Sequence, residues 1–199
     1  AIIHGNGGDD KIFGGLGADQ IFGDDGTDEI SGGGGADTIN PGAGDDMVRL
    51  GFDGFGTVVT DPSGTDILIV TGTSAANALT IKPGTTAGQI LFESTGTITG
   101  NGFETLRFDA GAGADTVTVP DLANSGVTGV SVDMGKRTSV IGTVCDSLGR
   151  ETPRLSVADD GAADTLFITG TDSAETFNAS NGTDAGRPRV LVTQGARQF

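Results

Sequence analysis

Residues 5–49 form five consecutive blocks of nine residues, with no insertion or deletion between them. Three columns of this array keep one residue type throughout: Gly at the fourth position, Asp at the sixth and an aliphatic residue at the eighth. The columns are Gly8, Gly17, Gly26, Gly35 and Gly44; Asp10, Asp19, Asp28, Asp37 and Asp46; and Ile12, Ile21, Ile30, Ile39 and Val48. Such a short fixed period is typical of solenoids, in which each repeat stacks on its neighbours.

Each column has a physical role. Gly at the fourth position allows left-handed turns that a Cβ would forbid, and these turns direct main-chain carbonyls toward a common point. Carbonyls and aspartate carboxylates are hard oxygen ligands, of which Ca²⁺ takes about six to eight. The end of each block would run as a short strand with its aliphatic side chain inward. One buried aliphatic residue per block is a thin core, so we expect bound Ca²⁺ to supply the missing stability.

The composition points the same way. The chain has 36 Gly, and its acidic residues are 22 Asp against 5 Glu, a balance that favours turns and strands over helices. The formal net charge of −16 argues against nucleic acid or an anionic membrane surface as a partner, and favours cations. No apolar run approaches the roughly 18 residues of a membrane span, so membrane insertion is not expected.

On these columns, residues 5–49 resemble the hemolysin-type, or repeats-in-toxin (RTX), calcium-binding family. The resemblance implies that two nonapeptides make one turn of a parallel β-roll. It also implies that each Ca²⁺ lies between the turn of one repeat and the turn two repeats later. In this chain the implied complete sites pair Asp10 with Asp28, Asp19 with Asp37, and Asp28 with Asp46. Pro41 departs from the usual Gly at the start of a block, and we interpret it as the end of the regular roll.

Beyond Leu50 the nonapeptide pattern is no longer evident, but runs of Val, Ile, Thr and Phe between Gly, Asp and Asn clusters indicate further strands. Residues 66–79 match residues 164–177 at a spacing of 98, so a unit of about 100 residues begins near 63 and again near 161. Its first copy reaches 111–117, which is similar to one more nonapeptide and adds Asp115 as a candidate metal ligand. The second copy stops earlier, so we expect the full-length protein to continue past Phe199.

We therefore predict an all-β chain with two regions. Residues 5–49 would form the RTX calcium-binding β-roll, and residues 50–199 a β-rich repeat region. No stretch of ten or more residues in the second region shows helical periodicity. A parallel β-helix-like continuation of the roll is favoured for it because the turn chemistry persists. A β-sandwich is the alternative, given the spacing of the strands.

Enzymatic chemistry has little support in the sequence. His4 is the sole histidine, so no H-E-x-x-H motif exists, and no G-x-S-x-G motif occurs. Cys145 is a lone cysteine, interpreted as a small buried apolar residue. Calcium-dependent polysaccharide lyases with β-helix folds use an Arg or Lys base. Within 134–154 the chain carries Lys136, Arg137, Arg150 and Arg154, which we interpret as solvated charges of a surface loop.

Three hypotheses about the function are consistent with the sequence. We favour a calcium-stiffened structural or adhesive segment of a secreted or cell-surface bacterial protein, such as an adhesin or a surface-layer protein, with no active site. Its partners would be calcium ions and neighbouring repeats or other copies placed end to end, and type I secretion would export it. The alternatives are a C-terminal secretion and folding module of an exported enzyme, and a lyase-like enzyme. The 150 residues that follow the array favour the structural segment.

Overall fold

The computed structural model describes residues 1–120, 122 and 125–133 in full. Beyond them it describes the backbone of five strands between residues 138 and 194. Apart from one short 3₁₀ turn, η1 (Phe52–Gly54), the regular structure described is entirely β. Among the described residues no helix is long and apolar enough to cross a membrane. The predicted all-β fold is confirmed.

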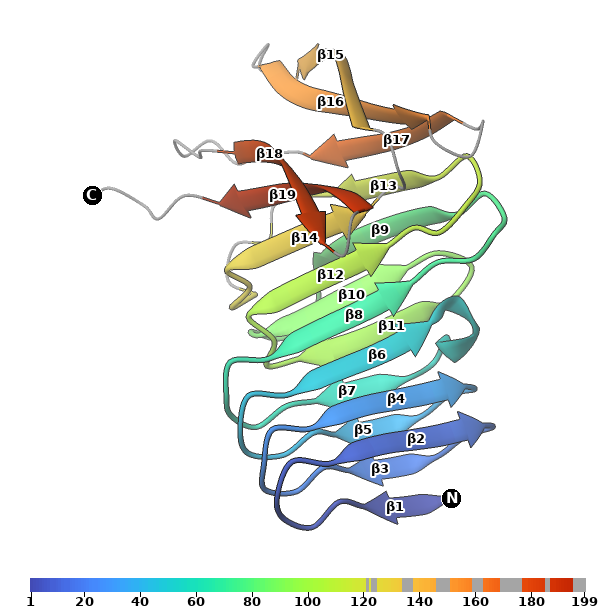
Figure 1. Cartoon of the computed structure of the whole chain (residues 1–199), viewed down its shortest axis with the longest axis vertical. Helices are drawn as coiled ribbons and strands as arrows, with labels where there is room; N and C mark the ends of the chain where they lie inside the picture. Colours follow the sequence, from blue (N-terminus) through green and yellow to red (C-terminus); the bar gives the residue numbers. More distant parts are fainter. Residues whose placement is uncertain are drawn as a thin grey trace, which may run out of the picture.

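The strands form two sheets that the chain visits in alternation as it winds away from the N-terminus (Figure 1). In spatial order, sheet 1 consists of β1 (Ile2–His4), β3 (Gln20–Phe22), β5 (Thr38–Asn40), β7 (Val58–Thr60), β11 (Thr97–Asn101), β10 (Gln89–Glu93), β9 (Ala78–Pro83), β13 (Thr116–Val119), β17 (Ala163–Ile168), β16 (Glu151–Ala158) and β15 (Thr138–Cys145). Sheet 2 consists of β18 (Phe177–Asp184), β19 (Arg187–Gln194), β14 (Gly129–Asp133), β12 (Thr105–Asp109), β8 (Ile67–Thr71), β6 (Met47–Gly51), β4 (Glu29–Gly34) and β2 (Lys11–Leu16). This arrangement is a β-solenoid.

Two nonapeptides make one coil of the solenoid. Strands β2, β4 and β6 are parallel, and Ile12 stands beside Ile30, which stands beside Val48, at steps of 18 residues. Ile21 and Ile39 are aligned in the same way on sheet 1. These eighth-position side chains are buried between the sheets because alternate residues of a strand face opposite sides. The parallel β-roll predicted for the array is confirmed.

The coil continues past residue 50, where the nonapeptide pattern is no longer evident in the sequence. Val59 is paired with Ile39, and Leu68 with Val48, so both columns gain a further residue at a step of 20. The two extra residues fall in the loop that contains η1, between β6 and β7. This insertion breaks the nine-residue period in the sequence while leaving the stacking intact.

Pro41 does not end the roll, and that interpretation was wrong. In the preceding coils, the amides of Gly5 and Gly23 donate to the carbonyls of Phe22 and Asn40 in the next coil. Proline has no N–H, so Pro41 cannot make the equivalent bond. The strands on either side of Pro41, β5 and β6, still pair in parallel with β7 and β8. Losing one bond of the ladder therefore does not stop the coil.

A three-stranded meander interrupts the parallel order of sheet 1. Strand β10 runs antiparallel to both β9 and β11, whereas β11 is parallel to β7 and β9 is parallel to β13. Sheet 2 passes directly from β8 to β12 across the same stretch, at a step of 38 residues. Three strands thus lie on sheet 1 where a regular coil would place one. The parallel continuation predicted for this region holds before the meander and after it as far as β14 and β17, beyond which β15, β16, β18 and β19 pair antiparallel.

The unit of about 100 residues changes sheets between its two copies. In the first copy β8 lies in sheet 2 and is followed by the β9–β10 hairpin in sheet 1. In the second copy β17 lies in sheet 1 and is followed by the β18–β19 hairpin in sheet 2. Adding 98 to the bounds of β9 and β10 gives 176–181 and 187–191, which overlap β18 and β19. The same local structure is therefore built on opposite faces of the solenoid.

The apolar core runs continuously from Ile12 to Val132, but its side chains change in size along the solenoid. The array contributes one aliphatic side chain per block. Beyond residue 50 the core adds Phe52, Phe92, Phe103 and Phe108, with Phe52 stacked on Phe108 at 5.6 Å between ring centroids. Full burial of one such side chain contributes about 1.5–3 kcal/mol. The division into domains at 49/50 stays a prediction.

We expect the aromatic part of the core to carry stability that does not depend on metal. Phe108→Ala should lower the free energy of unfolding by about 3–5 kcal/mol, with or without Ca²⁺, because it leaves a large cavity among buried rings. Phe13→Ala is the matched control, since Phe13 is 64% exposed and should change the value little. Urea unfolding followed by circular dichroism measures both. Similar values for the two variants would contradict this account of the core.

Candidate metal sites

The sixth-position aspartates stack in two ladders along the edges of the coils. In each ladder, the backbone N–H of one aspartate donates to Oδ1 of the aspartate two blocks later. The N···Oδ1 distances are 2.8 Å for Asp10 to Asp28, 3.0 Å for Asp19 to Asp37 and 2.8 Å for Asp28 to Asp46. The structure thus places side by side the same three pairs that the resemblance implied. Each carboxylate is held in position by the coil below it.

The second oxygen of each of these carboxylates has no hydrogen-bond donor. Oδ2 of Asp10, Asp19, Asp28, Asp37 and Asp46 is buried and accepts no hydrogen bond. The side chains themselves are shielded from water, with Asp28, Asp37 and Asp46 only 1–2% exposed. A buried charged oxygen without a partner is strongly unfavourable unless a proton or a cation neutralises it. The ladders therefore require one or the other.

Burial also changes the pKa values of three of these carboxyls. Desolvation raises the pKa of Asp28, Asp37 and Asp46, and the carboxylate of the aspartate one coil earlier raises each further. Hydrogen bonds from backbone amides partly oppose the increase. A raised carboxyl pKa means that stability is full below the unfolded value near 3.8 and falls as pH rises through the folded value. At neutral pH a cation is the better counter-charge.

Glycine keeps the space beside these oxygens open. A Cβ built on Gly5 would lie 2.8 Å from Oδ2 of Asp10 and would clash with the carbonyl oxygen of Gly23 in the next coil. At the fourth position, Gly26 has φ of +149° and a Cβ there would clash with the carbonyl of Gly8. Carboxylate and carbonyl oxygens therefore converge where a side chain would otherwise stand. This donor set fits Ca²⁺, which prefers hard oxygen ligands.

Comparison with known families agrees with this geometry. Residues 2–30 and 15–48 match the family profile of the RTX calcium-binding nonapeptide repeat, with four copies. Residues 2–48 are therefore RTX calcium-binding repeats, as the sequence columns predicted, and Ca²⁺ is their expected ligand. No curated protein and no solved structure gave a significant match to the chain.

The ladders extend beyond the array to residues that the sequence analysis missed. Oδ1 of Asp66 accepts from the N–H of Asp46 at 2.7 Å, and Oε2 of Glu104 accepts from the N–H of Asp66 at 2.9 Å. On the other edge, Oγ1 of Thr57 accepts from the N–H of Asp37 at 3.0 Å, so a hydroxyl replaces the carboxylate there. The sequence does contain a signal for Asp66, because residues 61–69 form a block with Gly64, Asp66 and Leu68 at the fourth, sixth and eighth positions.

Asp115 occupies a comparable position in a later coil. It is fully buried, and its Oδ1 accepts from the N–H of Asn77 at 2.7 Å, the same bond that joins the aspartates of the array. The residue one coil earlier is therefore an asparagine, so this step does not pair two carboxylates. The role of Asp115 as a metal ligand stays a prediction.

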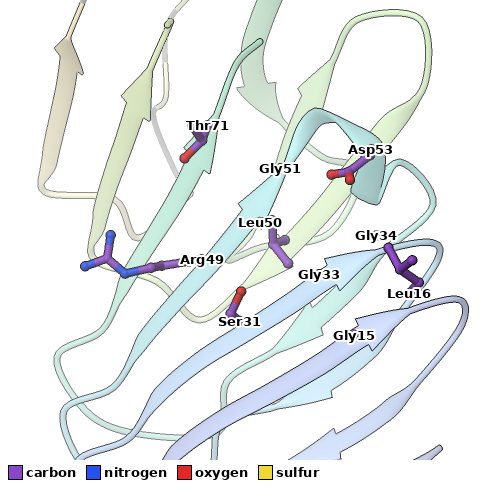
Figure 2. Close-up of a pocket in the computed structure, with 10 residues that line it drawn as sticks. All are labelled: Gly15, Leu16, Ser31, Gly33, Gly34, Arg49, Leu50, Gly51, Asp53 and Thr71. Carbon is purple, nitrogen blue, oxygen red and sulfur yellow. The ribbon is translucent and has the colours of Figure 1, made fainter.

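The basic cluster considered for a lyase lies largely outside the described residues. This applies to Lys136, Arg137 and Arg150, while for Cys145 and Arg154 only the backbone of β15 and β16 is described. The fully described part of the chain has a shallow groove on sheet 2, whose lining includes four glycines of β2, β4 and β6 (Figure 2). Arg49 and Asp53 lie at opposite ends of it, and Arg49 Nε is 3.2 Å from Glu29 Oε1. Arg49 is thus ion-paired with Glu29, and Asp53 lies away from this pair.

The position of Asp28 between two neighbours gives a test of the ladder. Asp28→Asn should remove about two bound Ca²⁺ per chain and Asp10→Asn about one, because Asp28 faces a carboxylate in the coil on either side. Asparagine keeps the shape of the side chain and removes its charge. Calorimetric titration with Ca²⁺ gives the stoichiometry. Equal losses from the two variants would show that the ions are not shared between successive coils in this way.

Proposed function

We propose that this chain is a calcium-dependent structural or adhesive segment of a secreted or cell-surface bacterial protein, with no active site of its own. The observation that carries the proposal is the row of buried Oδ2 atoms that have no hydrogen-bond donor, repeated coil after coil. We assign the carboxylate ligands to Asp10, Asp19, Asp28, Asp37 and Asp46, and carbonyl ligands to the turns that contain Gly8, Gly17, Gly26, Gly35 and Gly44. Bound Ca²⁺ would make the roll rigid.

The energetics support calcium as a folding switch. At a free concentration ten times Kd, each site contributes about 1.4 kcal/mol, so three sites contribute about 4 kcal/mol. Net stabilities of domains are only about 5–15 kcal/mol, so this is a large share. Where calcium is scarce, as inside a cell, the array would stay loose and suited to export by type I secretion. Once outside, it would bind calcium and fold.

Contact with neighbouring repeats or other copies is part of the proposal. Strands β1 and β2 are the outermost strands of the two sheets at one end of the solenoid (Figure 1). Ile2 on β1 is 68% exposed, and Leu16 on β2 is 94% exposed. Open strand edges beside exposed apolar side chains favour the addition of further strands. Another repeat or another copy stacked here would pair these edges and cover both side chains.

The other two functions make different demands. A folding module of an exported enzyme would use the same calcium-binding roll, and its catalytic residues would belong to another part of the protein. A lyase-like enzyme would need Arg137 or Arg154 beside a calcium ion and a bound sugar. Cleavage of an acidic polysaccharide by the purified chain would support the lyase and overturn the structural proposal.

Removal of calcium tests the proposed switch. In EGTA the chain should lose much of the β-sheet signal of residues 5–49, and its melting temperature should fall, because the buried carboxylates lose their counter-charge. Millimolar Ca²⁺ should restore both, whereas Mg²⁺ should do so poorly because it keeps its waters and strict octahedral geometry. Circular dichroism and thermal melting measure the effect. An unchanged spectrum and melting temperature in EGTA would rule the switch out.

A further inference from the structure

Three carboxylates meet where the array joins the rest of the solenoid. One carboxylate oxygen from each of Asp46, Asp61 and Asp66 lies within 4.8 Å of the other two. The three residues are 2%, 7% and 0% exposed. Asp61 and Asp66 lie outside the residues that match the RTX repeat, and neither was a candidate ligand in the sequence analysis.

In each carboxylate, one oxygen is fixed by a backbone amide while the other has no donor. Oδ1 of Asp46 accepts from Asp28 N at 2.8 Å, and Oδ1 of Asp66 accepts from Asp46 N at 2.7 Å. Oδ1 of Asp61 accepts from the N–H of Ser63 at 3.1 Å, within its own turn. The Oδ2 atoms of all three are buried and accept no hydrogen bond. The three side chains are thus held in place before any ligand arrives.

The position of Asp61 in its block is what makes this cluster different. Asp61 is the first residue of the block 61–69, where the first four blocks of the array have Gly. In those blocks the first residue lies against Oδ2 of the sixth-position aspartate, as Gly5 does against Asp10. Aspartate at that point adds a third carboxylate to a site that would otherwise have two. The formal charge of the site becomes −3 rather than −2.

The dimensions of the cluster suit a calcium ion. Ca²⁺ binds oxygen at about 2.3–2.6 Å, so two of its ligands can be up to roughly 5 Å apart, and the 4.8 Å limit here is within that reach. Glycine at position 64 also keeps side-chain atoms away from the cluster. Gly64 has φ of +143°, and a Cβ there would lie only 2.8 Å from Oδ1 of Asp66. Additional carboxylate charge is one of the means by which proteins raise their affinity for Ca²⁺.

A shared proton would neutralise the cluster less completely than a cation. Burial and the adjacent Asp66 carboxylate raise the pKa of Asp61 to about 8, so Asp61 can hold a proton near neutral pH when no metal is bound. Asp61 and Asp66 would share that proton in a side-chain hydrogen bond, and the buried Oδ2 of Asp46 would remain without a donor. A divalent cation contacts all three oxygens at once.

We propose that Asp46, Asp61 and Asp66 bind a Ca²⁺ ion more tightly than the two-carboxylate sites of the array. The site extends the proposed calcium binding to residues outside the RTX repeats. It joins β6 to β8, the last coil of the array to the first coil with a large aromatic core. The junction would therefore stay bound to calcium at concentrations too low to fill the array.

Calcium titration of the full chain, stripped of metal beforehand, tests this site. Asp61→Asn should lose the tightest binding step, or weaken it at least about 10-fold, while the weaker steps of the array remain. Asp61→Gly, which restores the residue of the array, should do the same. Glu93→Gln is the charge-matched control, because Glu93 lies on β10 and pairs with Lys82 at 2.8 Å. It should leave every step unchanged.

A second measurement separates the site from a general effect on folding. Without calcium near neutral pH, Asp61→Asn should melt at a temperature no lower than that of the wild type, because asparagine, like a protonated Asp61, carries no charge. Saturating calcium should raise the melting temperature of Asp61→Asn less than it raises that of the wild type. The proposed site would be overturned if Asp61→Asn had the same binding steps and the same calcium-dependent rise in melting temperature as the wild type. Asp61 and Asp66 would then be a carboxyl pair that shares a proton. If the wild type bound no Ca²⁺ at all, the proposed function itself would be contradicted.

Discussion

The structure depends on carboxylate oxygens that are buried in the turns without a hydrogen-bond donor. One oxygen of Asp28, Asp37 and Asp46 accepts from the coil below, and the other faces the turn backbone, where glycine leaves room for a ligand. Protein groups alone do not neutralise that second oxygen. The spacing of nine residues, the glycines and the excess of Asp over Glu all serve to bring these oxygens together with carbonyls. Stability of the array is thereby linked to a cation.

The two parts of the fully described chain use different sources of stability within one solenoid. The array buries one aliphatic side chain per block and relies on charge neutralisation in its turns. Beyond residue 50, fully buried rings such as Phe92 and Phe108 supply an ordinary apolar core. The coils are continuous across the boundary, since Val48 is paired with Leu68. A ligand that orders the array therefore builds on a coil that is already packed against the aromatic core.

The array and its aspartate pairs could be predicted because every block repeats the same residue types at the same spacing. The continuation through Val59 and Leu68 was missed because two additional residues in the loop that contains η1 disrupt the period without disturbing the stacking. Asp61 was missed for another reason, since it lies in a column that glycine occupies elsewhere. The β9–β10–β11 meander could not be predicted either, because short runs of Val, Ile and Thr do not indicate whether strands pair in parallel or antiparallel.

Hydrogen exchange of the backbone amides, with and without calcium, tests the central claim most directly. The N–H groups of Asp10, Asp19 and Asp28 donate to the next carboxylate of the ladder, so they exchange slowly only while the coils are stacked. The account predicts that adding calcium slows the exchange of amides in residues 5–49 by orders of magnitude, while amides of β8, β10 and β12 change little. Equal protection of the array with and without calcium would contradict it.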